Sequence, residues 1–447
     1  MNTRGSFTSR FGVIAAVSGS VIGLGNIWRF PYVAGENGGA AFILIYIACS
    51  CLISIPLMLS EFSLGRSTQC NTKRAFQKLA PGTPWKYVGY MGIFCAFVLL
   101  SFYCVIAGWA LEFIKESIGN EFAGKTAAEI QTNFNTFIDS GWRPILWMGI
   151  FMLATAFIVW SGIEKGIERF TKIFMPLFIL LLATLAVNSL MLPGAREGVT
   201  FLLRPDFSKI TAGTLLQAMG QSFFSMSLGL GCMLTYGSYI RKDENLPRIG
   251  GFVAISDVTV AILSGIAIFP AVFSFGISPI SGPELVFLTL PNIFAQMPGG
   301  YYIAIAFFTL LFLAAITSSI SMFEVIAAYL TEELHISRPK AVIGVLITIL
   351  CTGSLCALSQ RSGSTLLIGN TNLFDACDHL SSNILMPLGG LLIVIFTGWF
   401  FSPQKLRDEL TNHLTTNRWS YPVIRLLIKF VVPVVIALLF LTQIGLL

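Results

Sequence analysis

Long apolar segments separated by short polar stretches make up almost the whole chain of 447 residues. A hydrocarbon core about 30 Å thick is crossed by a helix of about 20 apolar residues. Eleven segments are long enough, and they cover roughly residues 10–34, 40–64, 88–114, 144–162, 168–192, 213–240, 249–276, 300–331, 340–358, 373–401 and 421–445. The longest polar stretches, about 116–142 and 402–420, leave no room for a second soluble domain. The pattern therefore predicts an all-α integral membrane protein with one domain, 1–447, and eleven spans.

The first span is interrupted by polar residues and helix breakers near its middle and outer end. Gly23, Gly25 and Pro31 weaken helical hydrogen bonding, and Asn26 and Arg29 are costly in lipid. A segment that only crosses the membrane needs none of them. We therefore expect a broken helix whose freed backbone groups line a cavity and bind a polar solute, which is typical of a transporter.

Composition and charge agree with a membrane protein and indicate its orientation. Hydrophobic residues make up 55% and charged residues 11% of the chain, against about 25% charged residues in soluble domains. With a cytoplasmic N-terminus, 20 of the 28 Lys and Arg residues fall in inner loops, as the positive-inside rule requires. This bias accounts for the net charge of +6 without a nucleic-acid partner, and eleven spans then place the C-terminus outside. The short N-terminal stretch has no small-residue cleavage site, so we expect no removable signal peptide.

The cysteines and histidines give no sign of an enzyme. The nine cysteines lie mainly in apolar segments, with no CxxC motif and no pair in an outer loop at a usable spacing, so we expect them to act as small buried hydrophobic residues. The three histidines, His335, His379 and His413, lie at span ends or in loops, and no HExxH motif occurs. An intramembrane enzyme would need a nucleophile and base or metal ligands within the spans.

Two halves of the chain resemble each other weakly. Gly23-Leu-Gly25 lies in the first span and Gly229-Leu-Gly231 in the sixth, five spans later. An odd repeat unit inserts its second copy upside down, and paired interrupted helices mark a transport site at the midplane. Close helix packing is the alternative explanation for such glycines. The repeat predicts a 5+5 inverted-repeat transporter fold with unwound first and sixth helices, in which repeat 1 covers about 10–192, repeat 2 about 213–401, and an extra helix about 421–445.

Polar side chains inside the spans are candidate ion ligands. Asn26 has a carboxamide oxygen suited to sodium, although it could also join two helices by a hydrogen bond. Thr317, Ser318 and Ser319 in the eighth span could complete a sodium shell or bond back to their own helix, and Ser225 and Ser227 carry the same ambiguity.

Three carboxylic acids also lie inside spans, where a lone acid must be neutral, paired or close to a cation. Asp257 in the seventh span has no basic residue within a turn or two, so a bound cation is its simplest partner, with a protonated or hydrogen-bonded acid as the alternative. Glu61 and Glu324 could instead accept hydrogen bonds from backbone N–H groups that the helix breaks expose.

Seven motifs fall in register along the chain: Gly23-Leu-Gly-Asn-Ile-Trp-Arg-Phe-Pro31, Glu36-Asn-Gly-Gly-Ala-Ala-Phe42, Ile55-Pro-Leu-Met58 leading to Glu61 and Gly65-Arg66, Gly220-Gln-Ser-Phe-Phe224, Ser227-Leu-Gly-Leu-Gly231, Thr235-Tyr-Gly-Ser-Tyr239 and Ala314-Ala-Ile-Thr-Ser-Ser319. With them the chain resembles the neurotransmitter:sodium symporter family, in its bacterial amino-acid branch. That family usually has twelve spans. The absence of the last one affects expected dimer contacts rather than transport, and we expect a monomer or weak dimer.

The resemblance implies two sodium sites. The first would use the Val21 carbonyl, Asn26, Ser225 and Asp257, and would touch the carboxylate of the substrate. The second would use the carbonyls of Gly19, Ile22 and Ala314 with the hydroxyls of Thr317 and Ser318. The first site would make co-transport obligatory, because its shell is incomplete without the substrate.

The resemblance also implies where an amino acid would bind. Its carboxylate would lie on N–H groups near Gly23, Leu24 and Gly25, with Tyr103 donating, and its amino group would meet carbonyls near Val21, Phe224 and Ser227. The side-chain pocket would be lined by Ser20, Leu99, Tyr103, Ile106, Phe224, Ser227, Leu230, Ser318 and Met322. None of these is charged, so we expect a hydrophobic or aromatic amino acid.

Two gates and the role of chloride follow from the same resemblance. Arg29 would pair with Asp378 on the outer side, and Arg4 with Glu332 on the cytoplasmic side. Asp257 stands where eukaryotic members have an amide and use chloride. We therefore expect a chloride-independent, sodium-coupled symporter of the bacterial inner (plasma) membrane that works by alternating access. The alternatives are a transporter of the same fold for another small zwitterion and a non-transporting amino-acid sensor.

Overall fold

The computed structural model describes residues 5–276, 286–297, 299–412 and 420–446. In these ranges, nine helices are long and apolar enough to cross a membrane, and a bent helix pair at the start of the chain adds a tenth. These ten match all predicted spans except the sixth, which is divided into two helices of 14 and 6 residues. The prediction of eleven crossings therefore agrees with the helices, once the sixth is counted as one broken span.

The helices of the first five spans follow the chain in order, with short helices between some of them. Several spans contain a wider π-helical turn, labelled η. The elements are α1 (Arg10–Val21), η1 (Gly25–Arg29), α2 (Phe30–Glu36), α3 (Ala40–Cys49), η2 (Ser50–Ser54), α4 (Ile55–Thr68), α5 (Thr72–Leu79), α6 (Lys86–Ile118), α7 (Ala127–Asp139), α8 (Trp142–Trp160), η3 (Ile163–Glu168) and α9 (Arg169–Leu190).

The second half contains the sixth to eleventh spans and a small antiparallel hairpin before the tenth span. Its elements are α10 (Ala195–Leu203), η4 (a 3₁₀ turn, Phe207–Lys209), α11 (Ala212–Ser225), α12 (Cys232–Gly237), α13 (Leu246–Ser274), α14 (Thr289–Gln296), α15 (Gly300–Glu333), α16 (Arg338–Ser359), β1 (Leu367–Ile368), β2 (Thr371–Asn372), α17 (Leu373–Asp378), η6 (His379–Leu385), α18 (Met386–Ile395), η7 (Phe396–Phe400), α19 (Pro403–Thr411), α20 (Tyr421–Leu426), η8 (Leu427–Val431) and α21 (Val432–Gln443).

Local sequence explains where several helices begin. The side chain of Ser9 accepts the N–H of Gly12 at 3.1 Å and caps α1. Asn245 caps α13 in the same way through the N–H of Arg248 at 2.9 Å. Thr126 and Glu129 form a reciprocal capping box at α7. Such side chains satisfy N–H groups that a helix start leaves without partners, so each marks a boundary in the sequence.

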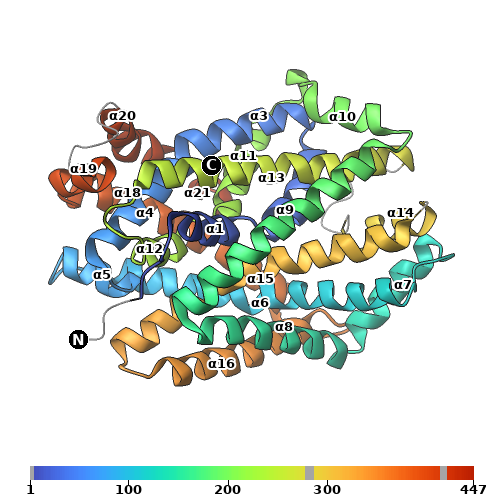
Figure 1. Ribbon diagram of the computed structural model, residues 1–447, viewed down its shortest axis with the longest axis horizontal. Coiled ribbons are helices and arrows are strands. Elements are labelled where there is room, and N and C mark those ends of the chain that lie inside the picture. Colours follow the sequence, from blue (N-terminus) through green and yellow to red (C-terminus); the bar gives the residue numbers. More distant parts are fainter. Residues whose placement is uncertain (1–4, 277–285, 298, 413–419, 447) are drawn as a thin grey trace.

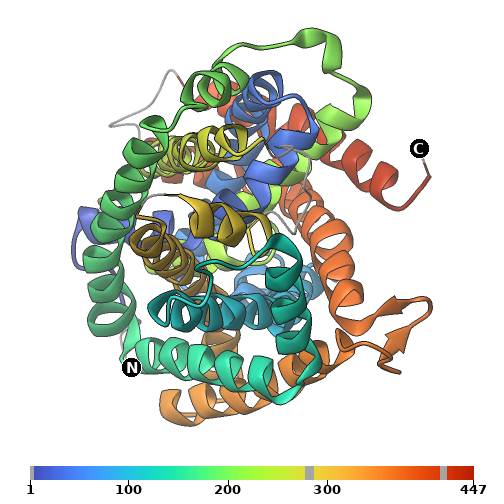
Figure 2. The same ribbon diagram turned by 90° about the vertical axis from the view of Figure 1, so that its right-hand side faces the viewer.

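The long helices lie roughly along one axis of the molecule (Figure 1). The chain start, α5, α12 and α19 gather at one end, and α7, α10 and α14 at the other. A view turned by 90° shows many helices nearly end-on, with the β1–β2 hairpin projecting at the side (Figure 2). The basic residues of α5 and α19 therefore share the end of the chain start, as the predicted orientation requires.

The third and eighth spans form the centre of the bundle. In the most apolar stretch of α6, 83% of residues are buried, against 22% in the last span, Tyr421–Gln443. The last span is thus peripheral, which fits its prediction as an extra helix outside the two repeats. Helix α6 packs closely against α15, and both contact the broken first or sixth span through their side chains.

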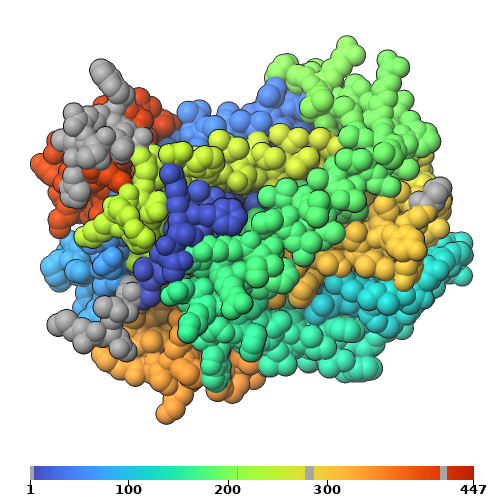
Figure 3. All heavy atoms as spheres, in the orientation of Figure 1, coloured from blue at the N-terminus to red at the C-terminus, as the bar shows by residue number. Residues whose placement is uncertain are grey.

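The outer surface of the bundle is apolar. Helix α9 crosses one face beside α13 (Figure 3), and its Ile173, Leu180 and Val187 are more than half exposed. Contiguous exposed apolar side chains indicate contact with lipid. Two cysteines expected to be buried, Cys51 and Cys351, are also exposed. The expectation was wrong for these two because an apolar residue in a span can face lipid as well as the core.

Candidate transport site

The first span breaks between α1 and η1, and its two halves are bent by 50°. Ile22 ends α1 in an extended conformation. A Cβ atom on Gly23 would lie 2.3 Å from Oγ of Ser318 and 3.1 Å from the hydroxyl oxygen of Tyr103. Glycine lets the backbone approach the third and eighth spans this closely without displacing either hydroxyl. The break predicted from Gly23, Gly25 and Asn26 is therefore present, at residues 22–24.

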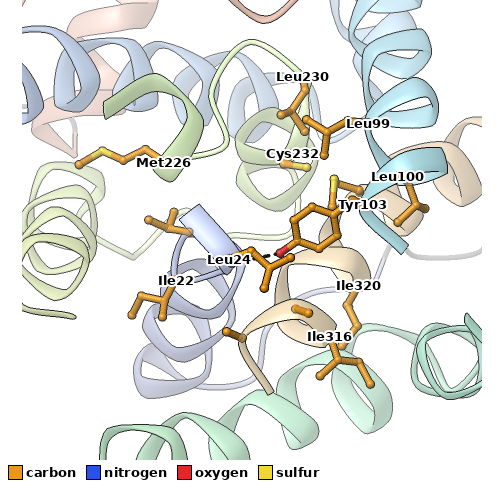
Figure 4. Close-up of a cluster of buried hydrophobic side chains, with 14 of the residues drawn as sticks. Ile22, Leu24, Leu99, Leu100, Tyr103, Met226, Leu230, Cys232, Ile316 and Ile320 are labelled. Carbon is orange, nitrogen blue, oxygen red and sulfur yellow. Dashed lines mark hydrogen bonds between the residues drawn. The ribbon is translucent and has the colours of Figure 1, made fainter. Parts of the chain in front are cut away.

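Side chains from three spans pair with the backbone of this break. The N–H of Leu24 donates to the hydroxyl of Tyr103 at 3.3 Å (Figure 4). The N–H of Gly23 donates to Oδ1 of Asn26 at 3.2 Å. On the other side, Oγ1 of Thr317 lies 3.4 Å from the carbonyl oxygen of Ile22, and 3.1 Å and 3.0 Å from the Leu313 and Ala314 carbonyl oxygens of its own helix. The exposed peptide groups are thus held by neutral groups from the first, third and eighth spans.

The sixth span breaks over a longer stretch, from Met226 to Gly231, between α11 and α12. Ser227, Gly229 and Gly231 have φ angles of 51°, 81° and 82°, which favour glycine and strain serine. The carboxylate of Glu61 accepts the N–H of Gly229 at 2.8 Å and of Leu234 at 3.2 Å. Glu61 therefore caps this break. This agrees with the alternative that an acid inside a span accepts hydrogen bonds from N–H groups at a helix break.

The same expectation is wrong for Glu324. This buried acid accepts a hydrogen bond from the Tyr239 hydroxyl at 2.7 Å and pairs with Arg338 at 2.6 Å. Arg338 also donates to the carbonyl of Val159 at 2.8 Å. The partner of Glu324 is a basic residue at the start of the next span, and the chain reversal between α15 and α16 brings the two together.

A cavity of about 20 Å³ lies between the two breaks. Its walls come from the first, third, sixth, eighth and tenth spans: Val21, Gly23, Gly25, Leu99, Tyr103, Phe224, Ser225, Ser227, Leu230, Ser318, Met322 and Met386. Figure 4 shows Leu99 and Leu230 next to each other beside the Tyr103 ring. Eleven of the twelve wall residues are among those predicted to contact the substrate or the first sodium, and they meet at one place.

Two predicted pocket residues, Ser20 and Ile106, are not in the wall. The carbonyl of Ser20 accepts hydrogen bonds from Ser227 and Ser318, each at 3.2 Å, and so ties the first span to the sixth and eighth. Ile106 is buried in α6, three residues after Tyr103. Contact of Ser20 and Ile106 with a substrate stays a prediction.

Met386 is a wall residue that sequence reasoning missed. A Cβ atom on Gly229 would lie 2.2 Å from the carbonyl oxygen of Met386, so the tenth span lies directly on the sixth break. The available signal was Pro387 with Gly389 and Gly390, because helix breakers and small residues inside a span allow close backbone approach. That signal gives a close contact but not its partner.

The residues predicted for the first sodium site surround Asp257. Nδ2 of Asn26 donates to Oδ1 of Asp257 at 2.8 Å and to its carbonyl at 3.2 Å. The hydroxyls of Ser225 and Tyr46 donate to the two carboxylate oxygens. Asn26, Ser225 and Asp257 are buried, and Val21 lies in the adjacent cavity wall. A carboxylate, a hydroxyl and an amide are all hard oxygen donors, so the set fits sodium.

The residues predicted for the second sodium site also lie together. Oγ1 of Thr317 lies 3.0 Å from the carbonyl oxygen of Ala314 and 3.4 Å from that of Ile22. A Cβ atom on Gly19 would lie 3.4 Å from Cβ of Thr317. Ser318 is the next residue, with its hydroxyl on the Ser20 carbonyl. This set contains only carbonyls and hydroxyls, which suits a monovalent hard cation.

The residues predicted for the two gates do not form the expected ion pairs within the described residues. The Arg29 guanidinium lies 4.5 Å from the centre of the Phe224 ring, and Asp378 accepts a hydrogen bond from Ser382 at 2.8 Å. Among the ion pairs of the described residues, none joins Arg29 to Asp378. Arg4 lies outside the described residues, and Glu332 accepts the N–H of Asn71 at 2.8 Å. Both gates stay predictions.

Comparison with known proteins identifies the family. A family model described as the sodium:neurotransmitter symporter family matches residues 4–138 and 125–446. This chain belongs to that family. An uncharacterized sodium-dependent transporter of Bacillus subtilis, YhdH, is 39% identical over 99% of this chain and 98% of its own. An uncharacterized sodium-dependent transporter of Haemophilus influenzae is 36% identical, with 98% of each chain covered.

A solved structure confirms the fold. The crystal structure of MhsT in complex with L-phenylalanine matches 99% of this chain and 100% of that chain, with 43% identity and a TM-score of 0.90. More distantly, a sodium- and chloride-dependent betaine transporter of Caenorhabditis elegans is 26% identical over 83% of this chain and 70% of its own. The predicted membrane transporter fold, with broken first and sixth helices, is therefore established for this member of the family.

Proposed function

We propose that this protein is a sodium-coupled secondary active symporter that takes up a hydrophobic or aromatic amino acid by alternating access and does not require chloride. The observation that carries the proposal is the position of Asp257, whose carboxylate is bonded by Asn26, Ser225 and Tyr46 directly behind the cavity at the two breaks. Sodium dependence in the names of related transporters supports the choice of ion.

Sodium would be held by protein oxygens and, at the first site, by the substrate itself. Val21, Asn26, Ser225 and Asp257 would form the first shell, and Gly19, Ile22, Ala314, Thr317 and Ser318 the second. The substrate carboxylate would approach the N–H groups of Leu24 and Gly25, where the hydroxyl of Tyr103 already lies. The second sodium would connect the first span to the eighth, and its release would free the two for movement.

The cavity wall supports an apolar side chain on the substrate. Leu99, Phe224, Leu230, Met322 and Met386 supply its apolar surface, and none of the wall residues is charged. Methionine side chains repack around different shapes, so the pocket suits several bulky residues rather than glycine. The related structure of MhsT holds L-phenylalanine, which agrees with this size class.

Chloride independence follows from the charge on Asp257. A chloride ion near the first sodium would add a negative charge that this carboxylate already provides. The side chains of Tyr46, Gln221 and Ser225, which resemble the remaining chloride contacts of the family, lie around Asp257 and the first break. Gln221 donates to the Gly25 carbonyl at 2.8 Å, and Tyr46 donates to Asp257.

We also propose that the protein lies in a bacterial inner membrane with a cytoplasmic N-terminus, because the basic ends of α5 and α19 share the side of the chain start.

The test is uptake into proteoliposomes with an inward sodium gradient, in competition with each of the twenty amino acids. We expect uptake that requires sodium, is inhibited best by bulky apolar amino acids and is unchanged when gluconate replaces chloride. Asp257→Asn should lose most of this uptake or regain part of it with chloride. Binding without accumulation would indicate a sensor, and a collapse of wild-type uptake in gluconate would rule out the chloride claim.

A further inference from the structure

Two cysteines from different spans face each other away from the transport cavity. Sγ of Cys356, in the last turns of α16, lies 4.0 Å from Sγ of Cys377, in α17 at the start of the tenth span. Cys356 is buried and Cys377 is half-buried. They are 21 positions apart in sequence, so the pair results from the packing of two spans and not from a local motif.

One hydrogen bond joins the two spans beside the cysteines, and two others lie within the individual spans. Ser359, three residues after Cys356, accepts the N–H of Phe374 at 3.0 Å, and Phe374 is three residues before Cys377. The same Ser359 hydroxyl donates to the carbonyl of Cys356 at 2.7 Å. Ser381 donates to the carbonyl of Cys377 at 2.8 Å. The helix ends are thus fixed against each other one turn from each thiol.

The pair lies at the end of the molecule away from the chain start. The residues after α16 bind α7, because the N–H of Ser362 donates to Asp139 at 2.7 Å and Arg361 donates to the Asp139 carbonyl at 3.0 Å. Helix α7 lies opposite the chain start (Figure 1). In the proposed orientation this end is outside the cell, where disulfides form and persist.

We propose that Cys356 and Cys377 form a reversible disulfide that restrains the outer end of the tenth span. A disulfide needs an S–S distance of about 2.0 Å, so the two sulfur atoms must approach by about 2 Å through side-chain rotation. The oxidant is a small or protein disulfide in the outer compartment. The thiolate of the more exposed Cys377 attacks it and forms a mixed disulfide, releasing one thiol.

Cys356 then attacks the mixed disulfide at the Cys377 sulfur and releases the second thiol of the oxidant. The two cysteines together lose two protons and two electrons, and the disulfide of the oxidant becomes two thiols. The link would hold Asp378, the residue next to Cys377, in a fixed position relative to α16. It would also restrain the π-helical turns of η6 that lead to Met386 in the cavity wall.

The effect on transport rests on the proposed function, whereas formation of the link does not. Asp378 is the predicted outer-gate partner of Arg29, so a tenth span that is tied to the ninth would be slow to open or close the outer side. We expect the oxidised protein to lose most of its uptake and to regain it after reduction.

The experiment uses the full-length protein in proteoliposomes, reduced and then treated with oxidised glutathione. We expect an intact mass lower by two hydrogen atoms and a linked peptide pair containing Cys356 and Cys377, reversed by dithiothreitol. Cys356→Ser and Cys377→Ser should each prevent the link and keep uptake under oxidant. Cys351→Ser, an exposed cysteine on the same helix, is the matched control and should still form the link.

Three results would overturn the proposal: absence of the linked peptides in the wild type, an unchanged mass loss in Cys356→Ser, or glutathione that stays on Cys377 of the wild type. Full uptake by the linked protein would overturn the claimed restraint. Absence of sodium-dependent uptake in the reduced protein would instead count against the proposed function, because the mass measurement does not depend on transport.

Discussion

The breaks in the first and sixth spans expose similar backbone groups but pair them with different partners. At the sixth break, the carboxylate of Glu61 accepts two N–H groups, those of Gly229 and Leu234. At the first break, the N–H groups of Gly23 and Leu24 are bonded only to the neutral Asn26 amide and Tyr103 hydroxyl. One break therefore has a carboxyl partner from a neighbouring span, and the other has only amide and hydroxyl partners.

This difference indicates that the two breaks have different roles in substrate binding. Hydrogen bonds to a carboxylate are stronger than those between neutral groups, so Glu61 stabilises the sixth break as part of the fold. Neutral partners are more easily exchanged for the carboxylate of a substrate. We expect the first break to bind the main-chain groups of the amino acid and the sixth to shape its side-chain pocket through Leu230 and Phe224.

The largest effect should come from removing the carboxyl group of Glu61. Glu61→Ala leaves two buried N–H groups without acceptors, and each hydrogen bond to a charged group contributes about 1.5–3 kcal/mol. We expect a loss of about 3–6 kcal/mol and little folded protein, measured as the unfolding temperature in detergent. Glu61→Gln keeps one acceptor oxygen, so its unfolding temperature should lie between those of the wild type and Glu61→Ala. If Glu61→Ala unfolded at the same temperature as the wild type, Glu61 would not stabilise this break.

Adding a methyl group at each break should separate stability from binding. On Gly229, with φ of 81°, a Cβ atom would lie 2.2 Å from the Met386 carbonyl and 2.8 Å from the Gly390 nitrogen. Both are backbone atoms, so Gly229→Ala should cost about 3 kcal/mol of stability. On Gly23 the closest contact is Oγ of Ser318, at the end of a short side chain that can turn, and the Tyr103 hydroxyl at 3.1 Å and Cβ of Ser318 at 3.3 Å need to move by only a few tenths of an ångström.

Gly23→Ala should therefore unfold close to the wild-type temperature, with a cost below about 1 kcal/mol, yet lose most substrate uptake because the methyl group enters the cavity. Thermal unfolding and sodium-dependent uptake, measured on both variants, test this contrast. If both variants lost stability equally, the two breaks would have the same structural role and the division proposed above would fail.

The sequence predicts the features that depend on local chemistry. Gly23, Asn26 and Pro31 indicate the first break, and Gly229 with Gly231 indicates the sixth, because glycine and proline weaken a helix wherever it packs. Apolar length locates ten of the eleven predicted spans within a few residues. The partners of Asn26, Ser225 and Thr317 are also brought together as the family resemblance implied.

Contacts between spans explain what the sequence does not predict. Met386 reaches the cavity because the tenth span packs on Gly229, and no periodicity in either segment encodes that pairing. Glu324 pairs with Arg338 across a chain reversal, and Cys356 faces Cys377 across two spans. The Arg29 side chain lies on Phe224, a choice set by the packing of the outer side.

A smaller effect should follow when the first break loses its partner from the third span. Tyr103→Phe removes the hydroxyl that lies 3.3 Å from the Leu24 N–H. In the proposed complex this hydroxyl donates to the substrate carboxylate, and a hydrogen bond to a charged group is worth about 1.5–3 kcal/mol, so the KM for the amino acid should rise at least about tenfold with little change in unfolding temperature. Tyr301→Phe is the control. The Tyr301 hydroxyl donates to the Ile118 carbonyl at 3.4 Å, and Tyr301 is not part of the cavity wall. An unchanged KM in Tyr103→Phe would remove this hydroxyl from the binding site.

The smallest effect should come from the side chain that the sixth break places in the pocket. Leu230→Phe enlarges a wall residue that lies beside Leu99 and Tyr103 (Figure 4), and should penalise large substrates most. Met322 and Met386 can repack around the added ring, so we expect the KM for tyrosine to rise only about fivefold more than that for leucine. Uptake of both amino acids by wild type and variant gives this ratio. The substrate carboxylate would be held at the first break, so the variant should change selectivity without changing the sodium requirement. An equal loss of uptake for tyrosine and leucine would show that Leu230 does not set the size of the pocket.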